Sequence, residues 1–203
     1  MKIYDLTQKI ENEMTAYCEE EKPKISSLFS IEKEKYRVTD MRLTSHLGTH
    51  IDVPAHIFQD GKNICNFSLE KFSGKGICLT VDEVEKIDFN LLVGIDYLLV
   101  YTGWDSYWNS EKYFENYPIL SKEIVEKIAV SHLKGIGIDC ISPDSWTSEE
   151  LINHKILLTG EKIIVENLCQ MEKILGKEFC FLCLPLKIEA DGSPVRAAAI
   201  VEK

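Results

Sequence analysis

The sequence lacks both an excess of positive charge and any long hydrophobic run. Its 203 residues include 23 Lys and Arg against 33 Asp and Glu, which gives a net charge of −10. Nucleic acids and anionic membranes bind basic patches, so this balance argues against either one as a partner. No apolar stretch approaches the roughly 18 residues that a membrane-spanning helix needs, and no basic-then-apolar leader opens the chain. We therefore expect a cytoplasmic protein.

The seven cysteines lack the even count and the spacing of a disulfide framework. Their pattern is typical of free thiols in a reducing compartment. Cys180 and Cys183 form one C-x-x-C, which would suit half a zinc site or a redox pair, but no second C-x-x-C completes a four-sulfur site. Because both lie in the apolar run 179–186, we expect them to be buried as small hydrophobic residues.

Internal repeats, linkers and low-complexity tracts are absent as well. The composition is 45% hydrophobic and 28% charged, as in ordinary globular proteins that bury a sizeable core. A chain of this length fits within one large domain. The sequence therefore predicts a single domain over residues 1–203.

Runs of apolar and β-branched residues alternate with amphipathic patterns, which predicts a mixed α/β fold. The expected strands are 2–7, 36–44, 76–81, 96–102, 135–139 and 163–168, and residues 179–188 and 196–201 are expected to form a closing hairpin around a turn at 191–194.

Two segments have the features of helices. Residues 121–133 carry apolar side chains at the three-and-four spacing of an amphipathic helix, with Ser121 as N-cap. Because this helix lies between two predicted strands, it predicts a parallel crossover. A capping box at residues 147–150 predicts a helix through about Leu158. Residues 8–35 are polar and mixed, and we expect a long loop there.

One short stretch holds three of the five histidines and one aspartate. The side chains that share one parity are His46, His50, Asp52 and His56. On an extended strand they would point to one face. The competing interpretation is a helical zinc-protease signature, which needs a glutamate after the first histidine, but Leu47 stands there. Because the stretch is also rich in glycine, proline and β-branched residues, we predict a strand.

Clustered imidazoles and a carboxylate are the ligands that zinc, manganese or iron prefer. A polar rim with histidines scattered by chance is the alternative. Four metal-competent groups at one parity favour a metal site.

The motif H-x-G-T-H-x-D-x-P-x-H, which begins at His46, resembles the signature of the cyclase family of metal-dependent hydrolases. That family includes bacterial kynurenine formamidases and isatin hydrolase. The resemblance extends to the T-G-W run at 102–104 and to the G-I-D and S-P-D runs within 137–144. It implies a layered β/β/α swivelling fold with a mixed sheet, a small-molecule substrate, and a homodimer or homotetramer.

The resemblance also extends the ligand set beyond the motif. Alone, His154 would be a surface or capping residue and Glu166 an ordinary residue at a strand end. The family carries a histidine and, twelve residues later, a glutamate in such a helix-to-strand unit, which implies metal roles for both. Since Asp52 and Glu166 each have two oxygens able to bridge, the set would hold up to two zinc or manganese ions with His46 and His50. His132 has no such match and is expected at a helix end.

His56 is left over as the acid/base, and the matching histidine of the family acts as proton donor and acceptor. A further metal ligand is the alternative for His56. The chemistry implied is hydrolysis of a small amide, formyl-amide or cyclic amide or imide by a metal-bound hydroxide. A non-catalytic metal- or ligand-binding module on the same scaffold is the alternative function.

Some positions depart from the family or keep two interpretations. Kynurenine formamidases are expected to have a tryptophan and a Pro-Gly lining the pocket where this chain has residues 14–18. This departure predicts weak activity on N-formylkynurenine and another small, uncharged or anionic, carbonyl substrate. Trp104 would form a pocket wall or pack in the core. Asp139 and Asp144 would orient ligands or, as we favour, serve turns and helix entry.

Overall fold

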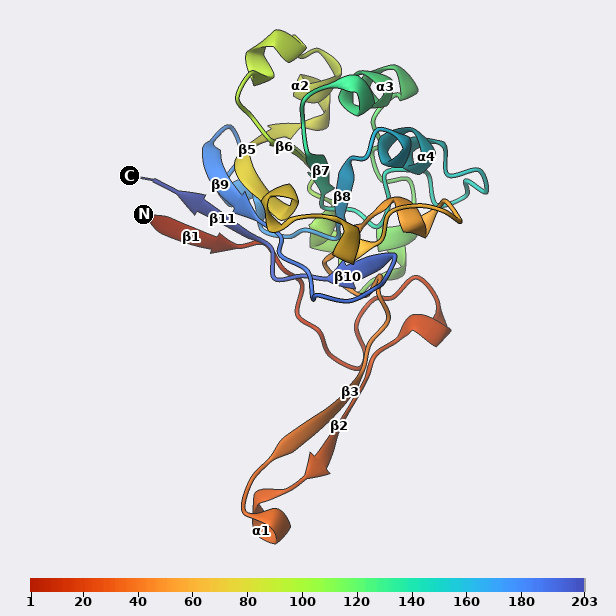
Figure 1. Cartoon of the computed structure of the whole chain (residues 1–203), viewed down its shortest axis with the longest axis vertical. Coiled ribbons are helices and arrows are strands. Elements are labelled where there is room, and N and C mark those ends of the chain that lie inside the picture. Colours follow the sequence, from red (N-terminus) through yellow and green to blue (C-terminus); the bar gives the residue numbers. More distant parts are fainter. Residues whose placement is uncertain (203) are drawn as a thin grey trace.

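The computed structural model describes residues 1–202 and shows a body with one protruding arm (Figure 1). The strands of the main sheet are β1 (Lys2–Asp5), β4 (His50–Asp52), β5 (Ser73–Thr80), β6 (Tyr97–Tyr101), β7 (Gly135–Ile138), β8 (Ile163–Glu166), β9 (Glu178–Leu182), β10 (Gly192–Pro194) and β11 (Ala198–Val201). Their spatial order is β1-β11-β9-β5-β6-β7-β8-β4-β10. The pairs from β5 to β8 are parallel and the others antiparallel. The predicted α/β fold with a mixed sheet is confirmed.

Few helices accompany this sheet. They are α1 (Ile31–Glu34), α2 (Val81–Glu85), α3 (Lys122–Val130) and α4 (Ile152–Thr159), with short 3-10 turns between elements. The predicted α3 is confirmed: it begins after Ser121, whose hydroxyl accepts a hydrogen bond from the backbone N–H of Ile124. Because α3 connects the parallel strands β6 and β7, the predicted crossover is also confirmed.

The central strands are buried on both faces, and each face has its own hydrophobic cluster. On β6, Leu98 belongs to the cluster beneath α3, while its neighbour Leu99 belongs to the cluster on the opposite face. On β8, Ile164 and Val165 divide in the same way. Successive side chains of a strand point to opposite faces, so strands covered on both sides form continuous apolar runs.

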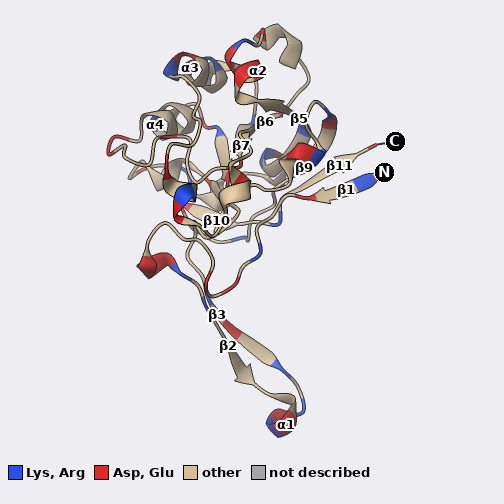
Figure 2. Ribbon diagram, turned by 180° about the vertical axis from the view of Figure 1, so that it is seen from behind, with Lys and Arg blue, Asp and Glu red and all other residues tan. Residues whose placement is uncertain are grey.

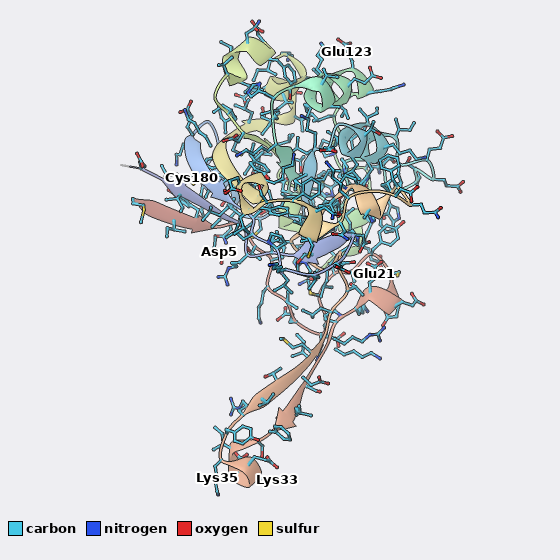
Figure 3. All side chains as sticks on the ribbon, viewed as in Figure 1. Asp5, Glu21, Lys33, Lys35, Glu123 and Cys180 are labelled. Atoms are coloured by element: carbon cyan, nitrogen blue, oxygen red, sulfur yellow. The ribbon has the colours of Figure 1, made fainter. Side chains whose placement is uncertain are left out.

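The expected loop at 8–35 is wrong for its second half. Residues from 24 onward form β2 (Lys24–Phe29), which pairs antiparallel with β3 (Val38–Arg42), and α1 lies at the tip of this hairpin. We call residues 24–42 the arm. It projects from the body, with Lys33 and Lys35 at its far end (Figure 3). Most of its apolar side chains are exposed. The alternation of apolar and polar residues, which marks a strand that buries one face, is therefore not required here.

The arm also differs from the body in charge (Figure 2). It contains five Lys and Arg and three Asp and Glu, a net charge of +2, so the rest of the chain carries −12 of the total of −10. Most of these charges lie at the tip, because β2 carries only Lys24 and β3 carries only Asp40 and Arg42.

The capping box predicted at residues 147–150 does not open α4. The helix begins at Ile152, after Leu151 in a left-handed conformation with φ 48°. Asp144 caps it instead, because its two carboxylate oxygens accept hydrogen bonds from the backbone N–H groups of Asn153 (2.7 Å) and His154 (3.0 Å). A cap supplied from outside the helix cannot be recognised by local spacing.

The C-terminal prediction is confirmed in its pairing and wrong in its turn. Strands β9 and β11 pair antiparallel as expected, but residues 192–194 form β10, which pairs with β4. Cys183 is buried as predicted, whereas Cys180 is exposed, because one face of β9 points outward. Within residues 1–202, no helix is both long and apolar enough to cross a membrane.

We predict that Ile128→Ala lowers the free energy of unfolding by about 2–5 kcal/mol, since it leaves a cavity between α3 and the sheet. Ile128 is 0% exposed, whereas Val130 on the same helix is 88% exposed. The matched variant Val130→Ala should therefore change stability by less than about 0.5 kcal/mol. Urea denaturation measures both, and equal effects would contradict the burial of this helix face.

Candidate metal centre and pocket

The site is built on β4, which lies between β8 and β10. In the antiparallel pairing, His50 lies opposite Glu166 of β8 and Asp52 lies opposite Gly192 of β10. His50 and Asp52 point to one face, as predicted, while Ile51 between them enters the hydrophobic cluster on the other face. The polar face is the one that α4 covers, and α4 carries His154.

The prediction of one extended strand through residues 46–56 is wrong outside β4. His46 precedes a turn in which Gly48 has φ 61°, a conformation that favours glycine. A Cβ at Gly48 would also approach the Met14 side chain within 2.9 Å. The turn brings the His46 ring back over β4, with Nδ1 2.7 Å from Asp52 Oδ1. The shared parity therefore predicted correctly that His46 lies beside Asp52, but the backbone between them forms a turn and not a continuous strand.

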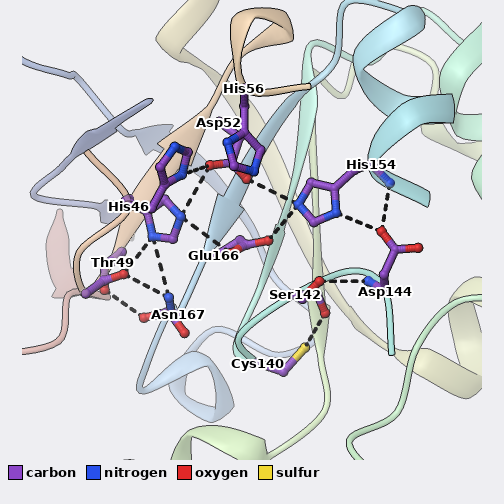
Figure 4. Close-up of polar contacts among 12 residues, drawn as sticks. His46, Thr49, Asp52, His56, Cys140, Ser142, Asp144, His154, Glu166 and Asn167 are labelled. Carbon is purple, nitrogen blue, oxygen red and sulfur yellow. Dashed lines mark hydrogen bonds and ion pairs between the residues drawn. The ribbon is translucent and has the colours of Figure 1, made fainter. Parts of the chain in front are cut away.

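Four side chains meet closely on this face (Figure 4). His50 Nε2 lies 3.3 Å from Asp52 Oδ1 and 3.4 Å from Glu166 Oε2. His154 Nε2 lies 3.3 Å from Glu166 Oε1 and 3.6 Å from Asp52 Oδ2. With His46, all five residues predicted as metal ligands are therefore together, although they come from three separate parts of the chain.

Some buried polar atoms of this cluster have no hydrogen-bond partner: His50 Nε2, Asp52 Oδ2 and Glu166 Oε1. Leaving buried polar groups unpaired is costly, so they need another partner. The other ring nitrogens are occupied, because Nδ1 of His50 donates to Gly48 O (2.8 Å) and Nδ1 of His154 donates to Asp144 Oδ2 (2.7 Å). Their Nε2 atoms are thus directed at the carboxylates, as in metal-binding histidines.

The donor atoms form two overlapping groups that fit divalent metal ions. His46, His50 and Asp52 make one group, and Asp52, His154 and Glu166 make the other, with the atoms of each within 4.8 Å of one another. Nitrogen and carboxylate donors of this kind suit zinc or manganese. Asp52 belongs to both groups, and Glu166 of the second group also lies close to the first, with Oε2 3.4 Å from His50 Nε2.

Protonation of the cluster follows from burial and from its close charges. Burial and the charge of Asp52 raise the pKa of Glu166. Burial also opposes the charge of Asp52, but the neighbouring histidines hold its pKa well below the usual range. Burial would lower the pKa of His46, yet hydrogen bonds to Asp191 and Asp52 raise it to about 10. Without an ion the cluster therefore retains protons, which metal binding would release.

His56 lies on a short 3-10 helix that begins at Pro54 and stands beside both metal-ligand groups. Its ring packs 4.0 Å from the His46 ring and 5.7 Å from the His154 ring, between centroids. Burial lowers the pKa of His56. His56 also forms a third group of potential ligands with His46 and Asp191, so both predicted roles, acid/base and ligand, are compatible with its position.

A cavity of about 280 Å³ opens beside this cluster. Its lining includes His46, His50, His56, His154 and Glu166. The lining also includes residues 15–17 of the N-terminal loop, Trp108, and Glu21, which lies near the base of the arm (Figure 3). Trp104, for which a pocket wall was one prediction, packs instead against Tyr107, and its Nε1 donates to Tyr113 O.

The two aspartates that had alternative predictions now have definite contacts. Asp139 accepts hydrogen bonds from Thr102 and Gly103, so the turn role is confirmed. Asp144 caps α4, so the favoured helix-entry role is confirmed, and it also accepts a hydrogen bond from His154 Nδ1. His132 lies just after α3, away from the cluster, with Nε2 donating to Leu92 O.

Sequence reasoning missed Asn167 and Asp191. Asn167 Nδ2 donates to Gly48 O (2.9 Å) and its Oδ1 accepts from Tyr113 (2.8 Å), which fixes the turn beside His50. Its position directly after Glu166 was the available signal. Asp191, whose Oδ2 lies 2.8 Å from His46 Nε2, was interpreted as a turn residue.

Comparisons with known proteins identify the family and the fold of this chain. The family model described as "Putative cyclase" matches residues 4–145. An uncharacterized protein of Methanocaldococcus jannaschii is 38% identical over 205 residues, covering 99% of this chain and 100% of that protein. The kynurenine formamidase of Bacillus cytotoxicus is 30% identical over 203 residues, covering 95% of this chain and 94% of that enzyme.

Solved structures share the fold. A crystal structure of an isatin hydrolase bound to the product analogue thioisatinate aligns with a TM-score of 0.84 at 20% identity, over 100% of this chain and 93% of that one. The matched segment of the family model covers more than two thirds of the sequence and contains the whole histidine motif. The chain therefore belongs to the cyclase family.

Proposed function

We propose that this protein is a metal-dependent hydrolase of a small amide, formyl-amide or cyclic amide or imide. The observation that carries the proposal is the set of unpartnered buried atoms, His50 Nε2, Asp52 Oδ2 and Glu166 Oε1, beside a cavity of about 280 Å³. The names of the relatives, kynurenine formamidase and isatin hydrolase, support hydrolysis.

His46, His50 and Asp52 would hold one divalent ion, and Asp52, His154 and Glu166 a second, with zinc or manganese as the candidates. When bound, such an ion lowers the pKa of water and polarises a carbonyl oxygen. The chain contributes the orientation of the donors, because Gly48 O and Asp144 hold the far sides of two imidazole rings.

His56 is the proposed acid/base. Its ring lines the cavity and lies beside His46 and His154 without belonging to either group around Asp52. Because burial lowers its pKa, the ring is neutral at pH 7 and able to accept a proton from attacking water. It then returns a proton to the leaving nitrogen, which must be protonated to depart as an amine.

The cavity lining favours an uncharged substrate with a flat ring. Tyr17 and Trp108 supply aromatic surface, and no Lys or Arg occurs among the described lining residues. Apart from the proposed metal ligands and His56, the one charged side chain among the described lining residues is Glu21. A substrate carboxylate beside Glu21 would lose water without gaining a Lys or Arg partner.

The proposal includes one domain over residues 1–203, a cytoplasmic location and a homodimer or homotetramer. The exposed apolar side chains of the arm, Leu28, Ile31 and Met41, support self-association, because exposed apolar surface is commonly covered by a partner.

Metal-free protein titrated with Zn²⁺ should bind two ions per chain, and His154→Ala should bind one, because His46, His50 and Asp52 remain. Calorimetric titration and elemental analysis count the ions. His132→Ala is the matched control and should keep both, since its ring contacts Leu92 O instead. Wild-type protein that binds no divalent metal would contradict the proposed function.

His56→Ala should keep its metal and lose about 10²–10⁴ of the hydrolysis rate, the usual worth of a general acid/base. His50→Ala should lose metal and activity together. Bound metal and turnover are measured on the same preparations. If His56→Ala loses metal as extensively as His50→Ala, His56 is a ligand. If metal-loaded wild-type protein hydrolyses no amide of the predicted classes, a binding module is the better function.

Formanilide should be hydrolysed with a kcat/KM at least about tenfold above that of N-formylanthranilate, which adds only a carboxylate, because the lining residues include Glu21 and no Lys or Arg to pair with that carboxylate. Glu21→Lys should narrow this ratio and Glu21→Gln should narrow it less. Absorbance assays measure all three proteins. Turnover of N-formylkynurenine at a kcat near the enzyme median of about 10 per second would contradict the proposed selectivity.

A further inference from the structure

Asp191 lies where β10 begins, beside the strand that carries His50 and Asp52. Gly192 pairs with Asp52, and the carbonyl of Asp191 accepts a hydrogen bond from the backbone N–H of Val53 (3.2 Å). The position of the Asp191 carboxylate relative to β4 is therefore set by sheet register.

The His46 ring is held on three sides. Its Nε2 lies 2.8 Å from Asp191 Oδ2, and its Nδ1 lies 2.7 Å from Asp52 Oδ1. The ring also packs directly on Gly192, where a Cβ would come within 2.7 Å of His46 Cε1. A hydrogen bond and a close packing contact thus fix one orientation of this ring.

This arrangement completes a pattern among the proposed histidine ligands. His50 and His154 each donate Nδ1–H to an oxygen and direct Nε2 at the carboxylates. His46 has the opposite arrangement, because Asp191 occupies Nε2 and leaves Nδ1 facing Asp52. Hydrogen bonds to the outer nitrogen commonly select the tautomer and orientation of a metal-binding histidine.

The same carboxylate oxygen also reaches His56. Asp191 Oδ2 lies 3.7 Å from His56 Nδ1, and the His46 and His56 rings stack at 4.0 Å between centroids. One side chain therefore borders both a proposed ligand and the proposed acid/base.

We propose that Asp191 is a positioning residue that holds His46 as the Nε2–H tautomer, presents its Nδ1 to a divalent ion, and keeps the His56 ring beside it. This inference rests on the proposed function, since it concerns the ion of the His46, His50 and Asp52 group. Gly192 is the second part of the device, because it allows the ring to lie against the backbone.

The test compares Asp191→Ala with Asp144→Ala, which removes the corresponding partner of His154. Chelator competition with Zn²⁺ measures both binding steps. Each single variant should weaken the affinity for one of the two zinc ions by about 10–100-fold, the usual effect of losing such a partner. The double variant should weaken the affinity for both ions. Asp60→Ala removes an exposed carboxylate near the motif and should leave both steps unchanged.

Ring-nitrogen NMR of ¹⁵N-histidine protein gives a readout that a merely structural role would not move. Zinc-loaded wild-type protein should show His46 protonated at Nε2, and Asp191→Ala should lose this signal. Asp191→Asn retains an oxygen acceptor and should restore both the tautomer and most of the affinity. Gly192→Ala should weaken the same binding step as Asp191→Ala, since its new Cβ would come within 2.7 Å of both His46 Cε1 and the backbone oxygen of Ile51, which belongs to the strand that carries His50 and Asp52.

The inference is overturned if folded Asp191→Ala binds both ions as tightly as wild type, or if Asp191→Asn is as defective as Asp191→Ala. Circular dichroism confirms folding, and Asp191→Asn decides the matter should the alanine variant not fold. Wild-type protein without any bound zinc is a different result, which contradicts the proposed function itself.

Discussion

The placement of β4 between β8 and β10 is the constraint on which the rest of the site depends. This short strand receives hydrogen bonds from two segments that are more than a hundred residues later in the chain. Register matters here more than strand length, because a slip of one residue would turn His50 and Asp52 into the hydrophobic cluster and Ile51 toward the cavity. The apolar side chain of Ile51 therefore stabilises the orientation of the polar ones.

The buried polar groups of the site lower the stability of the sheet that carries them. Two buried carboxylates and two buried imidazoles lie on β4, at the end of β8 and on α4 in otherwise apolar surroundings, and several of their atoms lack partners. Such groups destabilise a fold unless something binds them. A ligand that binds only the folded state adds its binding free energy to folding, so a divalent ion would stabilise the chain as well as equip it for chemistry.

The sequence predicted the elements whose residues carry a local hydrophobic period, namely α3 and the central strands. The amphipathic spacing of α3 and the apolar runs of the central strands were sufficient, because packing on the sheet requires those periods. The second strand of the arm, β3, lies within the predicted strand at 36–44, but β2 was missed because its side chains are mostly exposed. The start of α4 was misplaced because Asp144 caps it from outside the helix. His154 and Glu166 were assigned by family resemblance, since neither has a local signature. Asp191 and the Gly48 turn depend on contacts between distant segments, which no single stretch of sequence contains.

The arm is expected to be the part of the chain that is most susceptible to proteolysis. Its two strands bond to each other in a two-stranded sheet separate from the main one, and its side chains contribute none of the described buried hydrophobic residues. Local opening there costs little compared with opening the nine-stranded sheet. Lys33, Lys35 and Arg37 at and near its tip are cleavage points for a trypsin-like enzyme. Such an enzyme would cut the arm first and leave two fragments joined by the sheet, since β1 and β4 lie on opposite sides of the cut in sequence and both belong to the body.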